Sequence, residues 1–140
     1  MNRRILIVDD EESIRVALSR HFRMQDMEVD TACEGIDALD KLSRSPYRVM
    51  ICDVMMPRMD GIGLLRRMRS EYPMTRSIMI TGYVTLENAL ACLKFGAETC
   101  IFKPFADLSE LDQAVESAFA YHERWEQKLL QLRGMREFGA

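Results

Sequence analysis

The sequence lacks any apolar run near the roughly 20 residues that a bilayer-spanning helix requires. It also shows little that resembles a secretory leader. The basic segment Met1–Arg4 is followed by only four apolar residues, Ile5–Val8, before Asp9 and Asp10. We therefore expect no membrane association and no secretion, and we expect a cytoplasmic protein.

Positive charge is not in excess, and cysteine is scarce. The 19 basic and 22 acidic residues give a formal net charge of −3, so the charge balance does not favour direct nucleic-acid binding. The four cysteines form no CxxC pair, and Cys52 and Cys100 lie inside apolar runs. We interpret all four as reduced core thiols. A redox-sensing role for Cys92 and Cys100 is less favoured, because no cationic cluster flanks them.

Nucleotide-binding motifs are also missing. The segment Gly61–Arg66 does not complete a GxGxxG fingerprint, and no GxxxxGK[ST] loop occurs in the chain. The two histidines, His21 and His122, have no metal-ligand spacing to each other. A bound nucleotide, a zinc site and a histidine-based catalytic triad are therefore not expected.

The 140 residues suffice for one domain with its own core. Short apolar runs flanked by polar residues predict buried strands at Ile5–Val8, Val49–Cys52, Ile78–Ile80 and Cys100–Phe102. Segments with helical spacing alternate with them, at Glu12–Gln25, Gly35–Ser43, Gly61–Glu71, Leu86–Phe95 and Asp107 to about Arg133. This alternation predicts an α/β fold in which helices cover both faces of a parallel sheet.

One further strand has a different pattern. Met27–Ala32 alternates apolar with polar residues, which is typical of a half-exposed strand at the edge of a sheet. Placing this second strand outside the first predicts a doubly wound, five-stranded sheet of order 2-1-3-4-5, the order of flavodoxin-like folds. In such folds ligands bind beyond the carboxyl ends of the strands, so we expect the functional site there.

Polar residues follow four of these strands: Asp9 and Asp10, Asp53, Thr81, and Lys103. Three carboxylates that share a pocket are stabilised most simply by a bound cation, and Mg²⁺ prefers such oxygen ligands. A carboxylate nucleophile, an ion and a lysine together suit phosphoryl transfer. Asp53 is the expected nucleophile, because it stands alone at the end of a central strand.

These residues also form a recognisable set of motifs. Asp9-Asp10, the segment Asp53–Gly61, Thr81-Gly82 and the segment Lys103–Phe105 occur in this order at the expected strand ends. In this respect the chain resembles the response-regulator receiver domain of two-component signal transduction. The resemblance covers about residues 3–121, and residues 122–140 are expected to form a C-terminal helical extension or linker.

The resemblance implies that Asp53 accepts a phosphoryl group from the phosphohistidine of a sensor histidine kinase or phosphotransfer protein. Mg²⁺ would be held by Asp10, Asp53 and the backbone carbonyl of Met55, with Asp9 completing the acidic pocket.

Thr81 and Lys103 would contact the phosphoryl oxygens, and the Lys103–Pro104 bond is expected to be cis. The movement of Thr81 would then switch the surface of the fourth helix, fifth strand and fifth helix.

Two departures from the family pattern affect this expectation. Cys100 stands at the switch position where receivers usually carry an aromatic residue, so the path from Thr81 to the output surface differs. Met55 and Tyr83 occupy the positions that influence attack of water on the acyl phosphate. Neither is an acid or a carboxamide that would orient water, so we predict slow self-dephosphorylation.

The last helix is too long for the packing face of one domain, since about 27 residues span roughly 40 Å. Residues spaced by three and four along it form a coiled-coil seam: Leu108, Leu111, Val115, Ala118, His122, Trp125, Leu129 and Leu132. We expect the first half to pack on the sheet and the second half to remain exposed. A homodimer through this extension is the preferred hypothesis.

Several other interpretations remain at this stage. An aspartyl-phosphate hydrolase of the haloacid-dehalogenase type would need an aspartate where Met55 stands. A flavodoxin-like cofactor module would need a glycine-rich and hydroxyl-rich loop in place of Asp9–Glu12. The chain could also be a receiver used only for dimerisation, or a fragment of a larger regulator without its output domain. Asp10 as a helix cap and Asp60-Gly61 as a helix start are the structural alternatives to catalytic roles.

Overall fold

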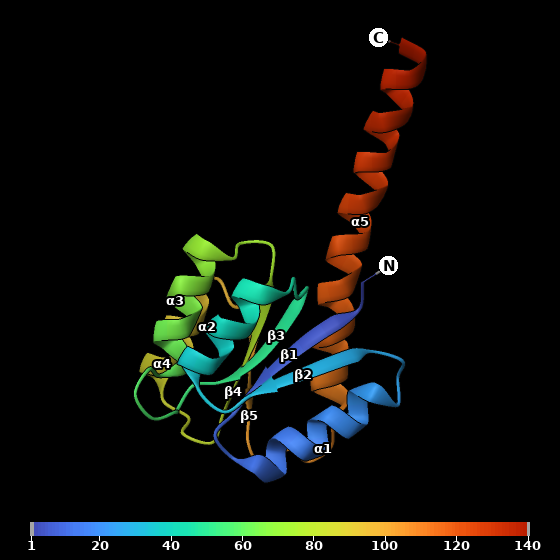
Figure 1. The fold of residues 1–140 in the computed structure, drawn as a ribbon. Coiled ribbons are helices and arrows are strands. Elements are labelled where there is room, and N and C mark those ends of the chain that lie inside the picture. Colours follow the sequence, from blue (N-terminus) through green and yellow to red (C-terminus); the bar gives the residue numbers. More distant parts are fainter. Residues whose placement is uncertain (1, 140) are drawn as a thin grey trace.

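The structure, a computed structural model, describes the backbone of residues 2–139 and the side chains of residues 2–134. Five parallel strands lie in the order β2-β1-β3-β4-β5, which confirms the predicted flavodoxin-like sheet (Figure 1). The strands are β1 (Arg4–Val8), β2 (Glu28–Ala32), β3 (Val49–Asp53), β4 (Arg76–Thr81) and β5 (Thr99–Phe102). The helices are α1 (Glu12–Arg23), α2 (Gly35–Arg44), α3 (Gly61–Glu71), α4 (Leu86–Lys94) and α5 (Ser109–Gly139).

The sheet separates two apolar cores, because successive side chains of a strand point to opposite faces. On one face, Ile5 and Ile7 of β1 pack with apolar residues of α1 and α5. On the other face, Leu6 and Val8 pack with residues of α2, α3 and α4. Helices therefore cover both faces, as the continuous apolar strands predict (Figure 1).

The second strand lies at one edge of the sheet and pairs with β1 alone, in the register Arg4 to Glu28 through Val8 to Ala32. Val29 and Ala32 are buried, whereas Glu28 is exposed and Asp30 and Thr31 are half-buried, which agrees with a half-exposed edge strand. The prediction that all four cysteines lie in the core is wrong for Cys33. This residue is exposed because it lies in the turn that follows the edge strand, whereas Cys52 and Cys92 are buried and Cys100 is half-buried.

Helix α5 continues well past the sheet (Figure 1). Its seam is buried from Leu111 to His122, whereas Trp125, Leu129 and Leu132 are exposed, as predicted. We refer to residues 125–134, which extend beyond the sheet, as the arm. Among the described residues, no helix is both long enough and apolar enough to span a membrane.

Candidate functional site

The site is built at the carboxyl edge of the sheet. Asp9 follows β1, Asp53 ends β3, Thr81 ends β4 and Lys103 follows β5. Since all strands are parallel, these four positions meet at one edge although they are up to 94 residues apart. The predicted site residues are thus brought to one place by the topology.

Lys103 is the centre of the polar contacts at this edge. Its Nζ lies 2.8 Å from Oδ2 of Asp9, 3.3 Å from Oδ2 of Asp53 and 3.4 Å from Oε1 of Glu11. Asp9, Asp53 and most of the Lys103 side chain are buried. One ammonium group therefore faces two buried carboxylates and the exposed carboxylate of Glu11.

Asp10 completes a cluster of carboxylates. One oxygen from each of Asp9, Asp10, Glu11 and Asp53 lies within 4.8 Å of the others, and Asp10 and Glu11 are open to solvent. Lys103 can neutralise only part of this negative charge. A set of carboxylate oxygens with no histidine or thiolate suits a hard cation such as Mg²⁺, which also retains water ligands on the open side.

The electrostatic environment of Asp53 reflects this crowding. Burial raises the pKa of Asp53, the charge of Lys103 opposes that rise, and the charge of Asp9 adds to it. Burial by itself lowers the pKa of Lys103, but its hydrogen bond to Asp9 and the charge of Asp53 raise that pKa overall. The pKa values of both Asp53 and Lys103 are therefore raised. An additional cation would relieve the repulsion between the Asp53 and Asp9 carboxylates.

The backbone after Asp53 is also fixed by the site. Oδ1 of Asp53 accepts a hydrogen bond of 3.2 Å from the backbone N–H of Met55. The Met55 side chain is exposed, so the backbone of this residue rather than its thioether faces the cluster. The other carboxylate oxygen of Asp53 is directed to Lys103.

Thr81 is buried beside the site, but its hydroxyl is engaged elsewhere. The backbone N–H of Tyr83 donates to Oγ1 of Thr81 at 3.0 Å, and that hydroxyl donates to the Tyr83 carbonyl at 3.1 Å. The Thr81 hydroxyl therefore holds the loop after β4 and, among the described residues, makes no hydrogen bond to the side chain of Asp53 or Lys103. The Thr81 carbonyl accepts a hydrogen bond of 2.8 Å from the backbone N–H of Lys103. The Tyr83 side chain is exposed.

The structure distinguishes which of the two acidic residues, Asp10 and Asp60, caps a helix. Asp60 caps α3, because its Oδ1 accepts a hydrogen bond of 2.7 Å from the N–H of Gly63. Asp10 does not cap α1. The residue at the cap is Glu11, whose own N–H donates to Oδ1 of Asp9 at 2.9 Å. The structural interpretation is thus confirmed for Asp60 and not for Asp10.

Two contributors were missed by the sequence analysis. Glu11 is the third carboxylate near Lys103, and no motif distinguishes it from the other acids of the run Asp9–Glu12. Gly61 packs so tightly under the site that a Cβ atom there would lie 2.0 Å from the carbonyl oxygen of Asp53. The Asp60-Gly61 pair was interpreted only as a helix start, although the glycine also permits this close approach.

The residue at the predicted switch position also has a defined setting. Cys100 on β5 is half-buried and packs against the core beneath α4, which includes Cys92. Phe102, two residues further along the strand, is exposed. Lys103 comes directly after Phe102, the last residue of β5. The Lys103–Pro104 bond is cis, as predicted.

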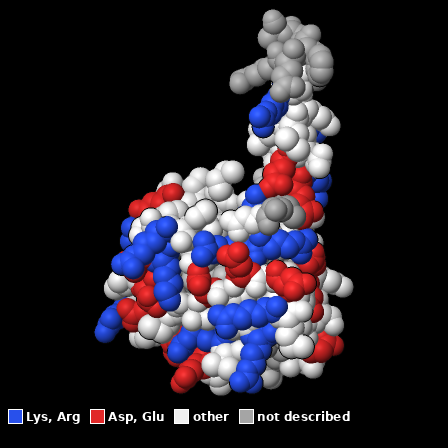
Figure 2. Space-filling model, turned by 45° about the vertical axis from the view of Figure 1, so that its right-hand side comes forward, with Lys and Arg blue, Asp and Glu red and all other residues white. Residues whose placement is uncertain are grey.

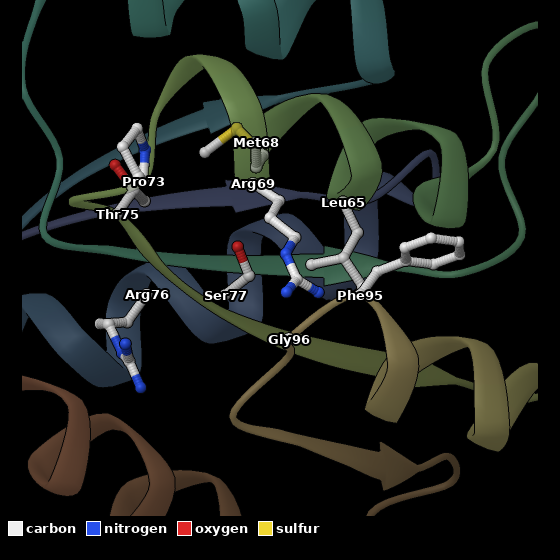
Figure 3. A pocket seen from close by; sticks show the side chains of 9 residues that line it. All are labelled: Leu65, Met68, Arg69, Pro73, Thr75, Arg76, Ser77, Phe95 and Gly96. Carbon is white, nitrogen blue, oxygen red and sulfur yellow. The ribbon is translucent and has the colours of Figure 1, made fainter.

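A second hollow lies away from this site. It encloses about 240 Å³ between α3, β4 and the end of α4, near the amino end of β4 (Figure 3). Arg69 and Ser77 face one another across it, and Arg69 donates a hydrogen bond of 2.8 Å to the carbonyl of Lys94 at the end of α4. This arginine satisfies a backbone carbonyl at the carboxyl end of α4, and none of the predicted site residues lines the hollow.

Comparison with known proteins is consistent with this geometry. Residues 5–116 match the family model of the response regulator receiver domain. The chain is 42% identical over 115 residues to the regulatory protein AtoC of Escherichia coli (strain K12). That match covers 82% of this chain but 25% of AtoC, so the chain spans only a quarter of that relative.

Solved structures share the fold. A CheY-like receiver domain from Methanospirillum hungatei JF-1 superposes with a TM-score of 0.82 at 29% identity, covering 89% of this chain and 99% of that one. The Thermotoga maritima response regulator TrrA, in complex with Mg²⁺ and BeF, superposes with a TM-score of 0.75 at 30% identity, covering 84% and 99%. The chain belongs to the response regulator receiver domain family.

Proposed function

We propose that Asp53 is the phosphoacceptor of a two-component or phosphorelay system. The observation that carries this proposal is the position of the Asp53 carboxylate, 3.3 Å from Lys103 and inside a cluster of acidic oxygens at the carboxyl edge of the sheet. A carboxylate oxygen of Asp53 attacks the phosphorus of a phosphohistidine on a sensor kinase or phosphotransfer protein. The P–N bond breaks, the imidazole leaves, and an acyl phosphate forms.

A divalent cation fits the acidic cluster. Asp10, Asp53 and the backbone carbonyl of Met55 would hold Mg²⁺, with Asp9 completing the acidic pocket. The four carboxylate oxygens within 4.8 Å of one another support this assignment, as does the Mg²⁺–BeF complex of TrrA. When bound, the ion neutralises negative charge on the phosphoryl oxygens.

The other residues at this edge bind and report the phosphoryl group. Lys103 is placed to neutralise one phosphoryl oxygen, and Thr81 is placed to donate its hydroxyl once it leaves its bonds to Tyr83. That exchange moves the loop between β4 and α4 and changes the surface of α4, β5 and α5. Apolar side chains are already exposed on this surface for a partner: Leu86, Leu90, Leu93 and Phe102.

The test is the intact mass of the protein after incubation with acetyl phosphate and Mg²⁺. We expect the wild type to gain one phosphoryl group and Asp53→Asn to gain none. Asp60→Asn is the matched control, because Asp60 is an acid that caps α3 outside the cluster and asparagine retains the cap. Equal phosphorylation of Asp53→Asn and wild type would exclude Asp53 as the acceptor.

The same experiment tests the ion. With EDTA in place of Mg²⁺, we expect phosphorylation of the wild type to fall strongly, because the acidic cluster would then repel the phosphoryl group. Adding excess Mg²⁺ back should restore it. Undiminished phosphorylation in EDTA would contradict the metal assignment while leaving Asp53 as the acceptor.

We also propose that the protein acts in the cytoplasm, by contact with partners or as the receiver of a larger regulator. The coverage of AtoC supports the second possibility, since this chain matches only 25% of that protein. The exposed seam of the arm supports association of two copies through Trp125, Leu129 and Leu132.

A further inference from the structure

Three arginines stand in a row at the edge of the sheet opposite Asp53. Arg3 precedes β1, Arg48 precedes β3 and Arg76 begins β4. These three strands are direct neighbours, and adjacent strands lie about 4.8 Å apart. The three side chains therefore line the amino edge that α5 crosses before it leaves the domain (Figure 1). We call them the arginine row.

Two members of the arginine row form ion pairs with acidic residues of α5. Arg3 donates to Glu116 at 2.9 Å and to Glu123 at 3.2 Å, and Arg48 pairs with Glu126. The three acids are seven and three residues apart, so they lie along one face of the helix. Acidic and basic side chains gather where the helix leaves the body (Figure 2).

The third member binds α5 through an aromatic ring. The guanidinium carbon of Arg76 lies 3.9 Å from the ring centroid of Tyr121, and Arg76 also pairs with Glu98. Arg76 is one of the residues that line the neighbouring hollow, and in Figure 3 its side chain extends toward α5. Beside it, Nε2 of His122 donates a hydrogen bond of 3.1 Å to the backbone carbonyl of Arg48.

Along α5, these polar contacts take over where the apolar packing against the sheet ends. Phe119 is the last apolar side chain of α5 in the buried core, among the described residues. From Tyr121 to Glu126 the helix is instead held by the arginine row. A helical segment as short as the arm is marginal in water without tertiary contacts, so its order depends on how its base is held.

We propose that Arg3, Arg48 and Arg76 clamp α5 across the amino edge of the sheet, so that the receiver and the arm form one rigid body. The clamp fixes the direction in which the arm presents Trp125, Leu129 and Leu132 to a second copy. It acts at the opposite edge from Asp53 and does not depend on phosphorylation.

The chain carries its own probe for this proposal. Trp125 is the single tryptophan, it lies on the arm, and its neighbour Glu126 pairs with Arg48. Time-resolved fluorescence anisotropy of Trp125 separates tumbling of the whole molecule from faster local motion on the nanosecond scale. In the wild type we expect slow decay with little fast component. In Arg48→Met and in Glu126→Gln we expect the amplitude of the fast component to rise several-fold.

Matched controls keep the result interpretable. Arg67→Met removes an exposed ion pair with Glu71 on α3 and should leave the decay unchanged. Light scattering on the same samples must give one mass for all variants, because self-association would also slow the probe. Glu126→Gln changes only the helix side of the clamp. If Arg48→Met fails to fold, the anisotropy decay of Glu126→Gln still tests the proposal.

The measurement uses unphosphorylated protein, and Asp53→Asn should give the wild-type decay. A failure of the phosphoryl chemistry therefore leaves this test unaffected. If Glu126→Gln and Arg3→Met both retain the wild-type decay, the arm does not depend on the arginine row. A large fast component already present in the wild type would equally overturn the proposal.

Discussion

Lys103 donates a hydrogen bond of 2.8 Å to Asp9, a carboxylate that is fully buried. Removing one partner of a buried ion pair leaves the other charge without compensation, and two further carboxylates face the same point. The pair therefore contributes to the stability of the fold as well as to the proposed chemistry.

We expect Lys103→Met to lower the free energy of unfolding by roughly 3 kcal/mol, because Asp9 and Asp53 would be left buried without the ammonium group. Urea denaturation measures the change. Lys94→Met is the control, since Lys94 is an exposed lysine of α4, and we expect a change within about 0.5 kcal/mol. Equal stability of Lys103→Met and wild type would show that Asp9 does not depend on this lysine.

Gly61→Ala should also be destabilising, by about 2 kcal/mol, because the new Cβ would collide with the backbone carbonyl of Asp53. The same displacement should reduce phosphorylation by acetyl phosphate. Gly134→Ala provides the contrast, because outside the helix's own backbone no atom of the described residues lies within 4 Å of a Cβ built there, and alanine favours helix. A stable, fully phosphorylated Gly61→Ala protein would be inconsistent with this close contact.

His122 gives the fold a pH dependence of known sign. Burial lowers the pKa of His122 below its ordinary value of 6.5, and the charges of Arg48 and Arg76 add to this effect, whereas the hydrogen bond to the Arg48 carbonyl and the charge of Glu126 oppose it. The unfolded chain therefore binds the proton first as the pH falls. The stabilising contribution is complete above pH 6.5 and is lost between 6.5 and the lower pKa of the folded state.

His122→Gln tests this dependence, because a glutamine amide can still donate to the Arg48 carbonyl but does not titrate. Urea denaturation at about pH 7.5 and about pH 5.5 should show a larger loss of stability in the wild type than in the variant. His21→Gln should keep the part of the pH dependence that comes from His122. An identical loss in wild type and His122→Gln would assign it to other groups.

The acyl phosphate should decay slowly, because neither Met55 nor Tyr83 carries a group that orients water. Met55→Asn and Tyr83→Glu should shorten the phosphoryl lifetime several-fold, as followed by intact mass after removal of acetyl phosphate. Val84→Thr, at the exposed position next to Tyr83, should leave the lifetime unchanged. Lifetimes that stay equal or become longer in both variants would refute this explanation.

Association of two copies through the arm can be tested with neighbouring leucines. Leu129 lies on the seam and is 60% exposed, whereas Leu130 lies off the seam and is 57% exposed. If the seam forms the interface, Leu129→Ser should weaken the dimer and Leu130→Ser should not. Light scattering over a concentration series, with and without phosphorylation, measures the mass. A monomeric wild type under all conditions would exclude the dimer.

The apolar pattern of the chain was sufficient to predict the sheet. Short runs such as Ile5–Val8 can be buried on both faces only in a strand covered by helices, and the alternation in Met27–Ala32 identifies an edge. The order of the strands then determines which loops meet. Asp9, Asp53, Thr81 and Lys103 could therefore be assigned to one edge from the sequence.

Other features depend on distances that no local pattern encodes. Glu11 lies near Lys103 because of the way the chain turns into α1, and Gly61 is required because α3 begins against the carbonyl of Asp53. The bonds of Thr81 to Tyr83 are likewise a property of the loop conformation. Cys33 was predicted to be buried together with the other cysteines, but it lies in an exposed turn after the edge strand.

The sequence by itself determined the class of fold, the edge that carries the acidic residues, and the seam of the last helix, because hydrophobic periodicity and strand ends are local properties. The predicted end of that helix, at about Arg133, was too early, since α5 continues to Gly139. Only the tertiary structure decided that Arg3, Arg48 and Arg76 meet α5 and that Lys103 is shared among three carboxylates. These contacts join residues far apart in the chain, and ion pairs form only where the packed backbone brings opposite charges within a few ångströms.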